Sequence, residues 1–329
     1  MGGCKRIGKR HRMKALVVIL NKNNAKNLRN CLNSLTEQTA KICKDFDLLI
    51  LDGGSTDDSK AVAEEFIYEY GCIKFKIQDK LGGTGYARRE ACNYALENDY
   101  NIIIWGDSEN VYAKDYIEKM IGSLGEFDAV SGTPKVCGGF FAHAFAWYHS
   151  IHLIFPGLYK FHLPGNNKGE KVSIFNEVVY PESKRAEDYG FSVHLLKKGK
   201  KLRTSVVDSN VYISVPEKLK EIGKWQMSRA KGVAEAAKIV GFKPIDSLAW
   251  SLIFFSLIVS LIISPINHIP LLLYSAFILI FSTFLFVRSL GYVKSPKKRY
   301  FLAPLIGVLI HSLYSILSLF YYFKSDENI

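Results

Sequence analysis

Short apolar runs alternate with amphipathic stretches through the first part of the chain. Residues 15–20 form a short apolar strand, and residues 46–51 and 73–77 are predicted as the second and third strands. Between them, apolar residues recur every three or four positions, which is typical of helices that pack by one face. Residues 101–116 add a fourth strand followed by a helix start, and residues 128–132 add another strand. This alternation predicts an α/β fold with a mostly parallel sheet flanked by helices.

Three much longer apolar runs follow, at residues 248–266, 269–287 and 301–323, without any Asp, Glu, Lys or Arg. Each is near the roughly 20 residues that a helix needs to cross a bilayer. The first two are joined only by Asn267 and His268, which predicts a hairpin. A basic loop precedes the third run, and the positive-inside rule places this loop in the cytoplasm. Three transmembrane helices would then put the acidic tail outside.

The change from charged to apolar sequence divides the 329 residues into a soluble part and a membrane part. We expect a basic disordered arm over residues 1–13, a folded domain over 14–215, interfacial helices over 216–246 and a membrane domain over 247–329. The formal net charge is +12. No zinc-finger or aromatic-rich RNA-binding signature accompanies this charge. We therefore expect phosphorylated substrates and anionic lipid as partners, and no nucleic acid.

Two acids, Asp107 and Glu109, follow the fourth predicted strand. In an open α/β sheet, ligands bind beyond the carboxyl ends of the strands. An acid-x-acid pair at that place suits a hard divalent cation, Mg²⁺ or Mn²⁺, which takes oxygen ligands and leaves positions for phosphate oxygens. The alternative is a strand end with solvated carboxylates.

Two turns with glycines also follow predicted strands. Asp52 begins the first turn, and Asp57 ends it, where it can cap the next helix. Gly82 opens the second turn, which leads into a helix carrying Arg88. Because Arg88 stands where a dinucleotide fingerprint has its third glycine, a Rossmann dehydrogenase is disfavoured. The side chain of Arg88 would meet a phosphate or a carboxylate, or lie on a solvated helix face.

The order of these motifs resembles family 2 of the glycosyltransferases, over residues 14–232. The motifs are Asp52 to Asp57, Gly82 to Arg88, Asp107-Ser108-Glu109, and Glu187-Asp188. The resemblance implies a GT-A fold and an inverting transfer of a sugar from a nucleotide-diphosphate sugar. It is closest in kind to membrane-anchored enzymes that act on polyprenyl phosphate or lipid-linked glycans.

The resemblance also implies roles for individual residues. Asp107 and Glu109 would hold the metal, Asp188 would be the catalytic base, and Glu187 would orient it. Donor contacts would come from Asp52, Asp57, Gly82, Arg88, Asp107 and Gln226. Arg229, in a segment similar to the QxxRW motif of the family, would neutralise the leaving diphosphate.

Two positions depart from the family pattern. Glu109 stands where Asp is usual, and its extra methylene moves the carboxylate outward. Ala230 stands where QxxRW has tryptophan, so an aromatic platform for the acceptor sugar is lost. This favours single transfer over processive addition.

Histidines and cysteines predict neither a metal centre nor a disulfide. Residues 138–163 combine many aromatic residues with four histidines, which fits helices on the membrane, a lining for an apolar acceptor tail, or core packing. His149 and His152 are one helical turn apart, but no third ligand is indicated. The six cysteines have no CxxC pair and no regular spacing, which favours free thiols in a reducing compartment.

The leading hypothesis is a membrane-bound, metal-dependent inverting glycosyltransferase with its catalytic domain in the cytoplasm. It would use a UDP- or GDP-sugar and a membrane-embedded acceptor. The alternatives are a catalytically silent scaffold with the same fold and a small processive polysaccharide synthase. A sugar nucleotidyltransferase is disfavoured because residues 21–24 lack the Gly-rich, basic loop expected after its first strand.

Overall fold

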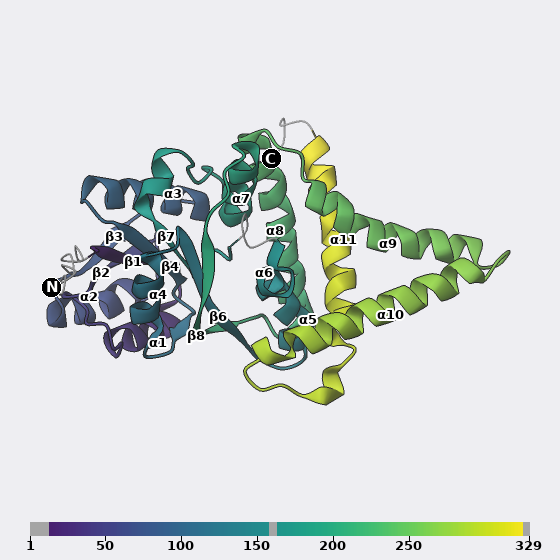
Figure 1. Cartoon of the computed structure of the whole chain (residues 1–329), viewed down its shortest axis with the longest axis horizontal. Coiled ribbons are helices and arrows are strands. Elements are labelled where there is room, and N and C mark those ends of the chain that lie inside the picture. The colour runs from purple at the N-terminus through teal and green to yellow at the C-terminus, as the bar shows by residue number, and fades with distance from the viewer. Residues whose placement is uncertain (1–12, 158–162, 325–329) are drawn as a thin grey trace, which may run out of the picture.

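An eight-stranded sheet forms the centre of the soluble part (Figure 1). The computed structural model describes residues 13–157 and 163–324. The strands are β1 (Ala15–Asn21), β2 (Phe46–Asp52), β3 (Ile73–Ile77), β4 (Ile102–Asp107), β5 (Val111–Tyr112), β6 (Ala129–Cys137), β7 (Lys168–Lys171) and β8 (Thr204–Ser214). Their order is β3-β2-β1-β4-β7-β6-β8-β5. Strands β1 to β4 run parallel, whereas β7 runs antiparallel to both of its neighbours.

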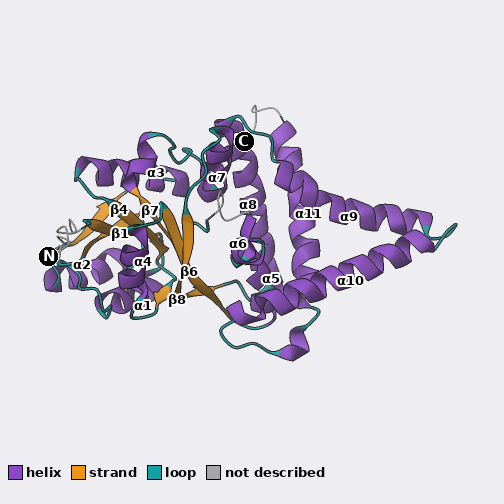
Figure 2. Ribbon diagram, in the orientation of Figure 1, coloured by secondary structure: helices purple, strands orange, loops and turns teal. Residues whose placement is uncertain are grey.

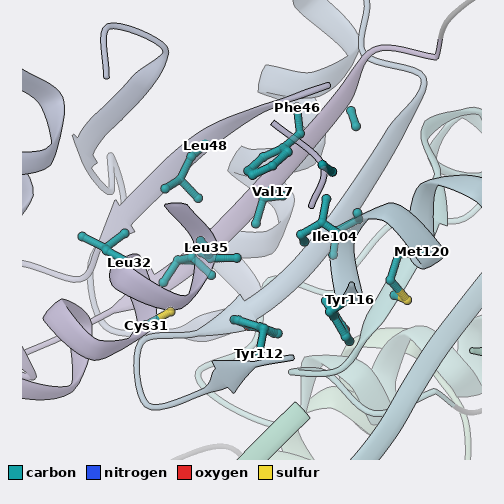
Figure 3. Close-up of a cluster of buried hydrophobic side chains, with 14 of the residues drawn as sticks. Val17, Cys31, Leu32, Leu35, Phe46, Leu48, Ile104, Tyr112, Tyr116 and Met120 are labelled. Carbon is teal, nitrogen blue, oxygen red and sulfur yellow. The ribbon is translucent and has the colours of Figure 1, made fainter. Parts of the chain in front are cut away.

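Helices cover both faces of this sheet. They are α1 (Ala25–Thr36), α2 (Ser59–Glu69) and α4 (Tyr116–Leu124) on one face, and α3 (Thr84–Glu97) and α7 (Glu187–Lys197) on the other. Side chains of β1 alternate between the two, since Val17 belongs to the first core and Leu16 to the second. Figure 3 shows the first core, which includes Leu32 of α1 and Leu48 of β2. Burial on both faces explains the continuous apolar runs and confirms the predicted architecture.

Strand β7 was not predicted because it reads as a polar segment. Its Lys168 and Glu170 are fully buried and form an ion pair, with 3.3 Å between Nζ and Oε1. Glu170 also accepts hydrogen bonds from Trp105 Nε1 (2.8 Å) and the Tyr180 hydroxyl (2.6 Å). Burial lowers the pKa of Lys168, and the Glu170 carboxylate opposes this shift. Two charges that neutralise each other therefore occupy the middle of the sheet.

The second half of the sheet also differs from expectation. The helix expected at the end of residues 101–116 begins at Tyr116, but the short strand β5, which was not predicted, precedes it and pairs antiparallel with β8. Strand β8 itself was missed, although it buries every second residue from Val207 to Ile213. That period of two was a usable signal.

From the end of β8 to residue 324, helices joined by loops make up the described chain (Figure 2). They are α8 (Leu219–Val240), α9 (Ile245–Ile263), α10 (Ile269–Ser289) and α11 (Ala303–Phe323), separated from the sheet by α5 (Phe140–His149) and α6 (Ile151–Ile154). Three segments, containing α9, α10 and α11, are long and apolar enough to cross a membrane. This confirms the three predicted apolar helices.

Helices α5 and α6 form core rather than a metal site. Residues 142–147 are all buried, and α5 packs against β6, α10 and α11. The His149 ring stacks on Trp225 with 6.0 Å between centroids, and His152 Nε2 lies 3.3 Å from Ser131 Oγ. Among residues 13–157 and 163–324, no group of three His, Cys, Asp or Glu residues could hold a metal ion. The core-packing interpretation of this segment is therefore supported.

The expectation of free cysteines is wrong for one pair. Cys43 and Cys72 form a disulfide across a sequence separation of 29 residues. Cys31, Cys92 and Cys137 are free. The two bonded cysteines meet only because α1, β2 and α2 bring the loops before β2 and β3 together, so their spacing gave no signal. The predicted basic arm up to residue 12 and the acidic tail from residue 325 lie outside the described residues.

Candidate active site

The predicted acids gather at the carboxyl ends of neighbouring parallel strands. Asp107 ends β4 and lies opposite Leu20 of β1, while Asp52 ends β2 and lies opposite Asn21 of β1. Asp107 is half-buried, and Glu109 is exposed in the turn that follows. The sheet therefore presents two sets of carboxylates on the same edge, where open α/β sheets bind ligands.

Electrostatics distinguish the acid pair from ordinary surface carboxylates. Burial, together with the charge of Glu109, raises the pKa of Asp107 to about 7, and the Arg88 guanidinium opposes this shift. Partial loss of hydration also raises the pKa of Glu109, and the positive charge of Arg185 opposes this rise. The charge of Glu109 thus favours protonation of Asp107, and a bound cation would keep both carboxylates ionised.

These two residues fit a hard divalent cation. Both offer carboxylate oxygens, which Mg²⁺ and Mn²⁺ prefer. Because the described residues place no third acid, histidine or cysteine with them, a bound cation would keep most of its coordination positions for non-protein ligands. Such an open site suits a metal that also binds phosphate oxygens.

Asp52 and Asp57 hold the loop between β2 and α2 in place. Both oxygens of the buried Asp52 are engaged, by the Asn21 amide (2.7 Å), the Ser55 hydroxyl (2.6 Å) and the backbone N–H groups of Gly54 and Ser55. Asp57 accepts from the backbone N–H groups that open two helices. These donors are Ala25 of α1 (2.9 Å) and Ser59 of α2 (3.1 Å). Asp58 and not Asp57 is at the cap position of α2, but the Asp57 carboxylate binds the first N–H group of α2 and that of α1.

The Gly-rich turn before α3 packs against the segment that leads into α7. Gly82 has φ +98°, a left-handed conformation that favours glycine. The next N–H groups, of Thr84 and Gly85, donate to the carbonyls of Lys184 (3.1 Å) and Ser183 (3.0 Å). The amino end of α3 therefore has its first N–H groups occupied by the segment that leads into α7.

Arg88 is buried between α3 and α7 and connects the two helices. The alternative that its side chain lies on a solvated helix face is therefore wrong. It is 1% exposed, and its Nε donates to Glu187 Oε1 at 2.8 Å. Its Nη2 donates to the Gly165 carbonyl at 2.6 Å, and its guanidinium lies 4.7 Å from the Trp105 ring centroid. Glu187 also accepts from the Thr84 hydroxyl. Although burial opposes it, the charge of Arg88 lowers the pKa of Glu187, which stays ionised.

Asp188 follows Glu187 on the same helix and is half-buried. Its Oδ2 accepts from the Gly165 N–H at 3.3 Å, and its Oδ1 accepts from the Tyr189 N–H at 2.8 Å. Ala186, just before the acidic pair, has φ 56° and ψ 35°, which is left-handed and costly for a residue with a Cβ. The chain therefore turns sharply into α7 and sets its two acids in different directions, Glu187 inward and Asp188 toward residues 165–168.

Gln226 and Arg229 form a separate cluster on α8. Gln226 is fully buried, and its Oε1 accepts from Arg229 Nε at 3.0 Å. The guanidinium lies 5.9 Å from the Tyr148 ring centroid. Two buried donors, Gln226 Nε2 and Arg229 Nη2, have no partner among the described residues. Unpaired buried donors are costly, so this cluster has unused capacity to bind an oxygen-rich group.

The structure thus joins some predicted residues directly. Gly165 links Arg88 to Asp188, and the charge of Arg88 reaches Asp107. Prediction missed Arg185, whose positive charge opposes the rise in the pKa of both Asp107 and Glu109. Its place two residues before the acidic pair of α7 was the available signal. The sequence alone did not show that this cation faces the other acid pair.

Comparison with known proteins identifies the soluble domain. The model of the family described as glycosyl transferase family 2 matches residues 16–176. The uncharacterized glycosyltransferase YfnE of Bacillus subtilis (strain 168) is 29% identical over 137 residues, which are 42% of this chain and 32% of that protein. Glycosyltransferase AglE of Haloferax volcanii is 36% identical over 72 residues, which are 22% of this chain and 23% of that protein. The matches thus span about a third or less of these curated relatives.

The whole chain shares its fold with a solved structure. Mannosyltransferase PcManGT from Pyrobaculum calidifontis, in complex with GDP-Man and Mn²⁺, superposes with a TM-score of 0.59 at 15% identity. The superposition covers 97% of this chain and 89% of that one. This likeness extends the GT-A fold to the present chain, and the family match covers the strands that carry its acid pair. Residues 16–176 therefore form a domain of the kind that glycosyl transferase family 2 describes.

Proposed function

We propose that this protein is a membrane-bound inverting glycosyltransferase that moves one hexose from a UDP- or GDP-sugar to a membrane-embedded acceptor. The observation that carries the proposal is the acid pair at the end of β4, which lies within electrostatic reach of Arg88 and Glu187. Glu187 in turn adjoins Asp188, so one assembly offers a cation site and a free carboxylate for proton transfer.

Asp107 and Glu109 would hold Mg²⁺ or Mn²⁺ on the donor diphosphate. The metal would supply positive charge to the leaving nucleotide. Support comes from the raised pKa of both acids and from the Mn²⁺ and GDP-Man in the PcManGT structure. The carboxylates of Asp52 and Asp57 already bind other groups of the chain. We therefore expect Asp52, Asp57 and Gly82 to act on the donor indirectly, by shaping the loops beside it.

Asp188 would be the catalytic base for a hydroxyl acceptor. The acceptor oxygen attacks the anomeric carbon, the bond from that carbon to the diphosphate breaks, and the acceptor proton passes to the carboxylate. Asp188 is half-buried, and its carboxylate accepts from two backbone N–H groups of the described residues, so it keeps lone pairs for this proton. A phosphate acceptor is already ionised and would need this base less. Glu187, held by Arg88, would fix where α7 begins.

Arg229 and Gln226 would bind a phosphate, either that of the leaving nucleotide or that of a polyprenyl phosphate. Their unpartnered buried donors support this role. Ala230 is fully buried, and its carbonyl accepts from Ser318 of α11 at 3.1 Å. Since α11 packs over the position where a tryptophan would extend, single transfer is favoured over processive addition.

The apolar helices support an acceptor that is embedded in the membrane. The positive-inside rule further supports a cytoplasmic catalytic domain, where nucleotide sugars are made available. A lipid-linked glycan and a polyprenyl phosphate both satisfy this arrangement.

The test is donor turnover by the purified protein in detergent. UDP- and GDP-sugars would be supplied with Mn²⁺, Mg²⁺ or a chelator, with and without polyprenyl phosphate or a glycolipid. Nucleotide release and the mass of the lipid would be measured. We expect metal-dependent release with one donor and one added sugar on the lipid. Nucleotide binding without turnover of any donor, on all acceptors, would favour the silent scaffold.

Three variants separate the roles. D107N should lose metal-dependent donor binding. D188N should keep donor binding but lose most transfer to a hydroxyl acceptor, and unchanged transfer would remove it as the base. E65Q, on an exposed carboxylate of α2, is the control and should behave as the unmodified protein.

A further inference from the structure

We infer that, of the segments the structure describes, only the α9–α10 hairpin crosses the membrane core, whereas α11 lies on the membrane surface against α8. This inference replaces the expectation of three crossings. It places the carboxyl end of α11 on the same side of the membrane as the catalytic domain. It concerns topology, so it stands or falls separately from the proposed chemistry.

Helix α11 runs beside α8 along its whole length (Figure 1). At one end, Ala303 packs in a cluster with Ile222. Further along, the Ser318 hydroxyl donates to the Ala230 carbonyl at 3.1 Å. At the other end, Lys238 Nζ donates to the Lys324 carbonyl at 2.8 Å. The two helices run parallel and side by side. If α11 entered the membrane to a given depth, α8 would have to enter to the same depth.

Helix α8 is too polar to cross a bilayer. It carries seven charged residues, namely Lys220, Glu221, Lys224, Arg229, Lys231, Glu235 and Lys238. Charged side chains inside the hydrocarbon core are costly and are rarely found there without a functional reason. Because α8 stays outside the core over its full length, α11 cannot pass through the core beside it.

The two sides of α11 differ as expected for a helix at an interface. Its exposed large apolar residues are Ile306, Leu313, Phe320 and Phe323, and their spacings of seven, seven and three place them on one stripe. The opposite side is buried and consists mostly of small or polar residues, namely Ala303, Pro304, Gly307, Val308, His311, Ser312, Ser315 and Ser318. One apolar stripe facing the acyl boundary, with protein behind it, fits a helix that lies in the membrane plane.

The α9–α10 hairpin has the opposite character. In its most apolar window, 17% of α9 is buried by the rest of the chain, and the value for the α10 segment is 28%, against 44% for the segment of α11. Figure 1 shows α9 and α10 extending together away from α11 to a tip at residues 264–268. Large apolar side chains near this tip, such as Ile262, Ile266 and Leu272, are exposed. Lipid is the partner that would cover such a surface.

Both ends of α11 are also tied to the catalytic side. Before it, Val293 pairs with Val136 of β6, and the Lys297 N–H donates to His143 Nε2 at 2.9 Å. The exposed basic residues of this loop fit anionic headgroups; they are Lys294, Lys297, Lys298 and Arg299. After α11, the contact between Lys324 and Lys238 returns the chain to α8.

Single-cysteine labelling in sealed membrane vesicles tests the inference. The background is the full chain with Cys4 and Cys137 replaced by serine, since Cys31 and Cys92 are buried and Cys43 and Cys72 are bonded. A membrane-impermeant maleimide is added from one side to K324C, with E65C marking the catalytic domain and N267C marking the hairpin tip. We expect K324C to be labelled from the same side as E65C. Labelling of K324C together with N267C would overturn the inference.

A depth measurement provides a second, independent readout. Spin labels at I306C, L313C and F320C should show similar depths in lipid vesicles, within one headgroup layer, if α11 lies on the surface. A crossing helix would instead place L313C deepest, with the other two near opposite surfaces. That profile would also overturn the inference, whatever the transferase activity of the variants.

Discussion

Replacing Arg88 by methionine isolates the buried ion pair that holds α3 to α7. Methionine keeps an unbranched side chain over the Trp105 ring but loses the bonds to Glu187 and to the Gly165 carbonyl. Glu187 would then keep its charge in the protein interior with only the Thr84 hydroxyl as a side-chain partner. The side chains of the pair are 2% and 9% exposed, so water cannot replace the missing guanidinium.

The expected magnitude follows from this burial. Removing one partner of a buried pair leaves an uncompensated charge and costs about 3–5 kcal/mol. For a domain of this size, 1 kcal/mol shifts Tm by about 2–4 °C, so R88M should lower Tm by roughly 6–20 °C. The shift would be read from thermal unfolding of the purified protein in detergent, followed by tryptophan fluorescence.

A surface pair of better geometry supplies the matched control. Arg29 and Glu65 form two hydrogen bonds, of 2.6 and 2.7 Å, each shorter than the 2.8 Å bond between Arg88 and Glu187. Their side chains are 44% and 57% exposed. Because exposed pairs contribute little, R29M should leave Tm close to that of the unmodified protein. Equal losses in R29M and R88M would refute the argument that burial decides the effect.

The same variant should change the pH dependence of stability. With Arg88 present, the pKa of Glu187 is below its ordinary value of 4.5, so this group's contribution is complete above that pH and is lost as pH falls further. In R88M, burial remains without the cation and the pKa of Glu187 rises. Stability then falls as pH rises through the new value. The Tm difference between the two proteins should therefore widen from pH 4.5 to pH 7, and a constant difference would contradict this reasoning.

Two further predictions concern packing and covalent links. A Cβ on Gly85 would lie 2.3 Å from the Pro181 carbonyl oxygen, so G85A should lower Tm, whereas G122A, with no atom within 4 Å, should be neutral or stabilising by about 0.5–1 kcal/mol. An unaffected G85A would show that the segment before α7 does not pack on α3 as described. Replacing Cys43 and Cys72 together by serine should cost about 3–4 kcal/mol, since the disulfide closes a loop of about 30 residues in the unfolded chain. Thiol titration of the unmodified protein that finds both cysteines free would contradict the bond.

The pattern of apolar residues along the chain predicted the elements that are buried regardless of distant partners. Strands β1 and β4 are buried on both faces, so their cores are continuous apolar runs, and the bounds of β1 to β3 were found to within about one residue. The apolar helices α9 to α11 were found for the same reason. Strand β7 was not found, because its buried residues Lys168 and Glu170 are charged. Their burial depends on the ion pair between them, which a pattern of apolar positions does not reveal.

The site residues divide in the same way. The acid pair of Asp107 and Glu109 was visible because it follows an unmistakable strand. The role of Arg88 depended on a partner 99 residues away, and neither its burial nor its bond to Glu187 could be read from the helix that carries it. Arg185 was missed because its electrostatic partners belong to another strand end.

Strand β7 also sets an order of events during synthesis. It joins β4 to β6, so the parallel half of the sheet, from β1 to β4, is encoded by residues 15–107, whereas the other half needs residues up to 214. Domains made on the ribosome fold from the amino end, and pairing between distant segments is slow. The β1–β4 half of the sheet can therefore form first, with the edge of β4 unpaired while the roughly sixty residues between β4 and β7 are synthesised. The hairpin of α9 and α10 leaves the ribosome only after β8 is complete, so the catalytic domain can close its sheet before the membrane takes up the chain.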